Sequence, residues 1–173
     1  MKSKNGFTLI ELMIVMILMG VLATIGVTTF ISSQAKGSDA ARKANLKALS
    51  QALELYYSDK LAYPLDDGAG GVKGCWATGG TIPGVCVKNQ VWQDSNGSTM
   101  YMPQFPADPS PKQKYVYVSS SGKQYQLYAH LVNDATTNRD PQIDDTITAK
   151  RINCGTIGTV YCNYGISSGN IAP

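Results

Sequence analysis

Glu11 is the residue in the first part of the chain whose chemistry stands out. The segment from Phe7 to Ile31 reads FTLIELMIVMILMGVLATIGVTTFI, and Glu11 is its only charged residue. A carboxylate among apolar side chains in a membrane is costly, and such residues usually pair with another group or face other protein segments. The position of Glu11 therefore predicts that it has a partner.

The rest of the chain offers little catalytic chemistry. The single histidine, His130, falls on the polar face of a predicted strand, which favours an exposed surface residue. The sequence shows no Ser/His/Asp grouping, zinc-ligand spacing or phosphate-binding loop. We therefore predict a protein that is not an enzyme and that needs no cofactor.

An acidic loop near the C-terminus is a candidate calcium site. It gathers carboxylates, which are ligands that calcium prefers, at Asp134, Asp140, Asp144 and Asp145. The loop lacks the spacing of an EF-hand, and Arg139 sits among the acids, so a solvated acidic loop is the alternative.

The apolar segment has the length of a membrane span. Leu12–Ile31 contains 20 residues without a charge, and as a helix they would cover roughly 30 Å, the thickness of a bilayer core. Lys2 and Lys4 precede it. The positive-inside rule then places the N-terminus in the cytoplasm and the remainder outside.

Three interpretations of this segment compete. A secretory signal could be cut after the small-residue stretch Val21-Leu22-Ala23, giving a mature chain that starts at Thr24. A plain membrane anchor is the second. Neither explains Glu11. In the third, the chain is cut between Gly6 and Phe7, and the new amine of Phe7 pairs with Glu11 of a neighbouring subunit, which sets the axial register of the assembly.

The residues around this junction carry a family resemblance. Lys4-Asn5-Gly6-Phe7-Thr8-Leu9-Ile10-Glu11-Leu12 resembles the class III signal of type IV prepilins and type II secretion pseudopilins. The resemblance implies cleavage after Gly6 by a prepilin peptidase, which also N-methylates Phe7. It further implies an inner-membrane subunit that assembly machinery polymerises through its apolar helix into a homopolymer.

One departure from the family concerns helix shape. The family often has a helix-kinking proline where this chain has Thr28. Gly20 and Gly26 remain as weak points, each costing about 1 kcal/mol relative to alanine in a helix. Any local unwinding during assembly is therefore expected between Gly20 and Thr29.

The helical pattern continues beyond the apolar segment. Apolar residues recur at spacings of three and four at Leu46, Leu49, Leu53, Tyr56 and Tyr57. Pro64 disfavours helical geometry at Tyr63, so we predict that the helix ends near Leu61.

The segment that follows the helix is long and rich in Gly, Pro, Ser and Asn. The resemblance identifies residues 64–113 as the αβ-loop of the family. It contains Cys75 and Cys86, whereas Cys154 and Cys162 lie near the C-terminus. An even cysteine count in an exported domain favours disulfides. Local pairing, 75 with 86 and 154 with 162, is the favoured one of three connectivities.

Alternating residues predict an antiparallel hairpin in residues 114–131. Lys114–Ser119 alternates tyrosine and valine, and residues 120–123 form a turn. In the second strand Tyr125, Leu127, Ala129 and Leu131 form an apolar face, with Gln124, Gln126, Tyr128 and His130 opposite. We expect the apolar face to pack on the Leu46–Leu53 stripe. Thr159–Ile166 is a weaker candidate strand.

These patterns predict an α+β protein. It consists of a leader (1–6), a membrane-spanning and filament-core half-helix (7–31), an amphipathic half-helix (32–63) and a head (64–173) with a small antiparallel sheet of three or four strands at 114–173. The net charge of +3 falls to about +1 without Lys2 and Lys4, which gives no strong nucleic-acid signal.

The predicted function is a structural subunit of a type IV pilus. Before assembly the subunit lies in the inner membrane, in contact with lipid. After assembly it is part of an extracellular filament. The order of residues around Pro106-Ala107-Asp108-Pro109 resembles that in the major pseudopilins of type II secretion. Ser110, however, stands where those proteins usually have Trp. A periplasm-spanning pseudopilus is therefore one alternative. A membrane-anchored adhesin or DNA-binding module is an alternative of another class.

Overall fold

One long helix and seven short strands make up the described fold. The computed structural model describes residues 6–76, 84–133, 152–158 and 160–169, with only the backbone described at 25–29. Helix α1 runs from Leu9–Lys60. It ends where Leu61 turns into the left-handed region with φ of 57°, and Pro64 follows soon after. The predicted helix end near Leu61 is confirmed.

The strands form three antiparallel sheets. They are β1 Lys73–Cys75, β2 Gly84–Val85, β3 Trp92–Gln93, β4 Met100–Met102, β5 Val116–Val118, β6 Gln126–Ala129 and β7 Tyr164–Ser167. β1 pairs with β2, β3 with β4, and β5-β6-β7 form a three-stranded sheet. The α+β class and the small antiparallel sheet are confirmed.

The predicted hairpin is present as β5 and β6. Tyr117 lies opposite Leu127, and Val116 lies opposite Tyr128. β7 adds to the other edge of β6, with Leu127 opposite Ile166. It begins at Tyr164, five residues later than the candidate strand that started at Thr159, and it continues to Ser167.

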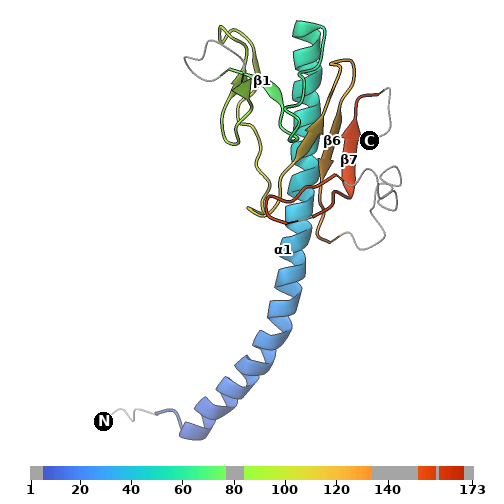
Figure 1. The fold of residues 1–173 in the computed structure, drawn as a ribbon. Helices are drawn as coiled ribbons and strands as arrows, with labels where there is room; N and C mark the ends of the chain where they lie inside the picture. Colours follow the sequence, from blue (N-terminus) through green and yellow to red (C-terminus); the bar gives the residue numbers. More distant parts are fainter. Residues whose placement is uncertain (1–5, 77–83, 134–151, 159, 170–173) are drawn as a thin grey trace. The chain divides into compact units, whose positions relative to one another are not determined.

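The core lies between the C-terminal part of α1 and the three-stranded sheet. Figure 1 shows β6 and β7 beside this part of the helix. Leu46, Leu49 and Leu53 are at most 1 % exposed, and they share one cluster with Leu127 and Ala129. The predicted packing of the apolar strand face on this stripe is confirmed. Burying a leucine of this kind stabilises the fold by about 2 kcal/mol.

The second face of the sheet is less polar than the alternation predicts. Tyr128, assigned to the polar face, is buried and belongs to a small cluster with Val116, Cys154 and Cys162. The disulfide-bearing C-terminal segment covers this face. Tyr128 does lie on the face opposite Leu127, as predicted, but this face is buried at Tyr128 because residues distant in sequence cover it.

Residues 64–113 carry more order than a long irregular loop. Two short hairpins, β1–β2 and β3–β4, lie within it. Trp92 of β3 is fully buried and donates a hydrogen bond from Nε1 to the carbonyl of Gly74, 3.2 Å away. Disulfides join Cys75 to Cys86 and Cys154 to Cys162, which is the local connectivity.

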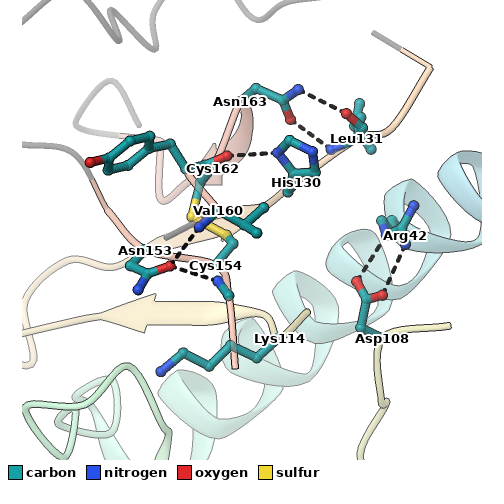
Figure 2. The surroundings of a disulfide bond; sticks show 12 residues. Arg42, Asp108, Lys114, His130, Leu131, Asn153, Cys154, Val160, Cys162 and Asn163 are labelled. Atoms are coloured by element: carbon teal, nitrogen blue, oxygen red, sulfur yellow. Dashed lines mark hydrogen bonds and ion pairs between the residues drawn. A yellow bond between two sulfur atoms is a disulfide. The ribbon is translucent and has the colours of Figure 1, made fainter. Parts of the chain in front are cut away.

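A buried ion cluster ties α1 to two segments of the head. Arg42 is 1 % exposed. Its Nε and Nη2 donate to the two oxygens of Asp108 at 2.9 and 3.0 Å, and its Nη1 donates to Asp39 at 2.7 Å. Figure 2 shows the paired bonds between Arg42 and Asp108. The Asp39 carboxylate also accepts the amides of Val132 and Asn133. The cluster therefore fixes α1, the αβ-loop and the chain after β6.

Tyrosine hydroxyls fasten the end of α1 to the head. Tyr63 and Tyr125 both donate to Glu54, at 3.0 to 3.1 Å. Tyr117 donates to the carbonyl of Pro64 at 2.6 Å. Burial is the main cause that raises the pKa of each of these three hydroxyls, for Tyr125 to about 12. Folding therefore favours the protonated phenols.

We expect alkaline pH to destabilise the head. An unfolded tyrosine loses its proton near pH 10, whereas Tyr125 keeps it to about pH 12. The stabilisation is therefore complete below pH 10 and is lost as the pH rises from 10 to 12. Urea unfolding at a series of pH values measures the free energy of unfolding. In Tyr125→Phe this free energy should fall less steeply between pH 10 and 12 than in the wild-type chain. Tyrosine ionisation complete at pH 10 without unfolding would contradict this prediction.

Candidate processing and assembly site

The start of α1 is fixed by Thr8 and Glu11. The Thr8 backbone amide and Oγ1 each donate to Oε2 of Glu11 at 2.8 Å. In return, the Glu11 amide donates to Oγ1 of Thr8 at 3.4 Å. Thr8 is thus the N-cap, and Glu11 is the third residue of the first turn.

This arrangement is a capping box. A Thr-x-x-Glu sequence satisfies two amides that would otherwise lack partners at a helix N-terminus. The carboxylate also lies where the helix dipole favours negative charge. Glu11 was predicted to pair between subunits, and the cap gives it a second role within the chain. The Thr-x-x-Glu spacing was the signal that would have indicated this second role within the chain.

The predicted cleavage junction lies immediately before the cap. Gly6 is exposed, and open space surrounds its α-carbon on the side-chain face. Phe7 is 91 % exposed. Cleavage after Gly6 would therefore create an amine one residue before the N-cap. Oε1 of Glu11 has no hydrogen-bond partner among the residues that the structure describes, so one carboxylate oxygen is available to another group.

Apolar side chains are exposed on all sides of the first turns. Every large apolar residue from Phe7 to Leu22 is at least 49 % exposed. An apolar surface of this size on a single chain indicates that other molecules cover it. A helix that is hydrophobic all round is typical of one surrounded by protein or lipid.

The other features predicted in this half are only partly described. Gly20 lies within α1 with open space around it, and Gly26 falls in the stretch whose backbone alone is described. Across the described residues, no helix meets the length and hydropathy needed to cross a membrane. The predicted span of 7–31 includes residues 25–29 and stays a prediction.

The chain divides into two compact units. They are Met1–Gly37 and Ser38–Pro173. The capping box and the exposed apolar turns belong to the first unit, whereas the core, both disulfides and the ion cluster belong to the second. Each set of contacts is therefore complete within its own unit.

The predicted calcium ligands lie outside the described residues. Asp134, Asp140, Asp144 and Asp145 all fall in the segment 134–151. The described ranges hold no group of three or more metal-ligating side chains. His130, expected on the surface, hydrogen-bonds through Nδ1 with the carbonyl of Tyr161 at 2.7 Å (Figure 2).

Comparison with known proteins concerns the same N-terminal region. A family model described as the prokaryotic N-terminal methylation motif matches residues 1–27. This chain carries a prokaryotic N-terminal methylation motif. The motif contains the predicted cleavage junction, the capping box and most of the exposed apolar turns.

Curated relatives share about a third of the chain. The type IV major pilin protein PilA of Myxococcus xanthus is 48 % identical over 59 residues, which are 34 % of this chain and 27 % of that protein. Type II secretion system core protein G of Pseudomonas aeruginosa is 36 % identical over 63 residues, 36 % of this chain and 44 % of that protein.

Core protein G of Vibrio cholerae is 33 % identical over 67 residues, which are 39 % of this chain and 46 % of that protein. The chain thus spans less than half the length of these relatives. No solved structure matches it significantly.

Proposed function

We propose that the chain is a structural subunit of a type IV pilus. The observation that carries this proposal is the first part of α1, which is apolar and exposed all round from Phe7 to Leu22 and whose N-cap, Thr8, lies two residues after Gly6. The methylation motif and the similarity to a type IV major pilin support it. The relatives are named as a pilin and a secretion-system core protein, which also supports a structural role over an enzymatic one.

The proposed assembly uses the available oxygen of Glu11. A prepilin peptidase removes residues 1–6 and N-methylates Phe7. The ammonium of Phe7 in one subunit then pairs with Glu11 of the next, while Thr8 keeps the carboxylate in place. A charge in an apolar bundle is tolerated when paired, so the pair sets the axial register of identical subunits.

The proposed route begins in the inner membrane. The half-helix 7–31 holds the subunit there in lipid, with its head outside, until the assembly machinery moves it into an extracellular filament. The apolar residues that lipid first covers are then covered by neighbouring subunits. This exchange of one apolar environment for another needs little net change in hydrophobic free energy.

The mass of the mature N-terminal peptide tests the processing step. Digestion of the protein from a host with a prepilin peptidase should yield a peptide that starts with N-methyl-Phe7. An unmethylated peptide starting at Thr24 would support the secretory-signal interpretation and refute this proposal. Gly6→Ala is a suitable companion variant, because Gly6 has open space around it and the substitution tests processing without disturbing the fold.

A pseudopilin of type II secretion is the second candidate. It is favoured by the similarity to several core proteins G, which cover a larger share of their own length than the pilin does. Shearing cells and finding the chain in a surface filament would favour the pilus. Loss of secretion of other proteins after deletion of the chain would favour the pseudopilus.

A further inference from the structure

The sequence Asn96-Gly97-Ser98 places a serine two residues after an asparagine. This Asn-x-Ser/Thr spacing, with any residue but proline between, marks asparagines that accept N-linked sugars in exported proteins. Of the nine asparagines in the chain, only Asn96 has this spacing. Because so short a motif also arises by chance, its place in the fold decides whether a modifying enzyme can reach it.

The motif lies at the tip of the hairpin that β3 and β4 form. The two strands pair antiparallel, and residues 94–99 connect them. Residues 95–98 are all exposed, whereas Trp92 at the base of the hairpin is fully buried. N-linked sugars are bulky and need a position on the surface. The hairpin tip provides such a position, and the buried tryptophan holds the hairpin on the head.

Asp94 holds the hairpin tip in shape. Its Oδ2 accepts a hydrogen bond from Oγ of Ser98 at 2.7 Å, and its Oδ1 accepts the amide of Thr99 at 3.2 Å. Its carbonyl accepts the amide of Gly97 at 3.2 Å. Gly97 has a φ of 68°, a left-handed conformation that glycine adopts without strain. None of these contacts uses the side chain of Asn96, so the turn does not depend on it.

The side-chain nitrogen of Asn96 is the atom that a sugar would join. Among the described residues, nothing accepts a hydrogen bond from this Nδ2, and Oδ1 has only a long contact of 3.5 Å with Oγ of Ser95. Asn153 and Asn163 differ, because their Nδ2 atoms donate to backbone carbonyls at 3.2 and 2.9 Å. Those two side chains serve the fold, whereas the amide of Asn96 is exposed and available for reaction.

We propose that Asn96 is an acceptor site for an N-linked oligosaccharide. The donor is a polyprenyl-diphosphate-linked oligosaccharide, and the enzyme is a membrane oligosaccharyltransferase that acts outside the cytoplasm. Nδ2 of Asn96 forms a bond to C1 of the first sugar, and the bond between C1 and the diphosphate oxygen breaks. The polyprenyl diphosphate leaves with that electron pair and takes up the proton that Nδ2 releases. The inference rests on the part of the proposed function that places the head outside the cytoplasm.

The mass of one tryptic peptide from the full chain, purified from its own host, tests the proposal. Trypsin cuts after Lys88 and Lys112, which releases residues 89–112 as a peptide without cysteine. We expect this peptide to carry the added mass of a glycan and to release sugar fragments in the mass spectrometer. Asn96→Gln and Ser98→Ala should each return the peptide to the mass of its sequence. Ser98→Thr should keep the glycan, because threonine supplies a hydroxyl at the same spacing.

Ser95→Ala is the matched control, because Ser95 is an exposed serine of the same turn but lies outside the motif. It should keep the glycan. A wild-type peptide with the mass of its sequence would overturn the proposal, and so would added mass that persists in Asn96→Gln. The N-terminal peptide of the same digest separates this proposal from the pilus. N-methyl-Phe7 on a chain without a glycan would refute only the site at Asn96, whereas a glycan on a chain that starts at Thr24 would refute only the pilus.

Discussion

Replacing Glu11 by glutamine is expected to abolish filament assembly while the amount of subunit in the membrane stays normal. Glutamine can still accept the hydrogen bonds of Thr8, because a capping box works with either side chain. It cannot pair as a charge with the Phe7 amine of a neighbour. The unpaired ammonium would then be left in an apolar bundle, at a cost of several kcal/mol.

The measurement compares two fractions from the same cells. Filaments sheared from the surface report assembly, and the membrane fraction reports insertion. Glu11→Gln should reduce the first by more than tenfold and leave the second unchanged. Wild-type amounts of filament in this variant would refute the register role of Glu11. Absence of this chain from sheared filaments of wild-type cells would instead favour the monomeric adhesin or DNA-binding alternative.

Thr8→Ala is the matched control for the cap. It removes Oγ1, which both donates to Glu11 and accepts its amide, but it keeps the charge. Losing an N-cap costs about 1 kcal/mol of helix stability. We therefore expect reduced rather than absent assembly. Loss as severe as in Glu11→Gln would show that the position of the carboxylate matters as much as its charge.

Replacing Arg42 by methionine is expected to have the largest effect on stability. Removing the guanidinium leaves two carboxylates in the head without their cation, and the Asp108 side chain is 1 % exposed. Breaking a buried ion pair from one side costs about 3 to 5 kcal/mol. Burial by itself lowers the pKa of Arg42, but the bonds and charges of Asp108 and Asp39 outweigh it and leave the pKa raised.

Urea unfolding at pH 7 measures this cost. Lys47→Met is the control, since Lys47 lies on the same helix but is exposed, and surface changes are usually within about 0.5 kcal/mol. The double variant Arg42→Met with Asp108→Asn should recover part of the lost free energy of unfolding, because it removes one of the two unpaired carboxylate charges. A single variant as stable as the Lys47 control would contradict the structural role of the cluster.

Much of this protein could be predicted from local sequence patterns. The apolar segment, the lone Glu11 and the Pro64 signal gave a helix whose end is confirmed, because helix formation depends on neighbours within one or two turns. The tyrosine–valine alternation likewise predicted a hairpin, which is present as β5 and β6. Its strands are separated by a short turn, which leaves few pairings open.

The sequence by itself therefore determined where α1 ends, which strip of α1 is buried and where the β5–β6 hairpin lies. Tertiary structure alone decided what covers the second face of the sheet and which cation matches Asp108. Tyr128 shows the reason. Its burial depends on Cys154 and Cys162, and such contacts between distant segments depend on how the chain packs, which no periodicity in the sequence records.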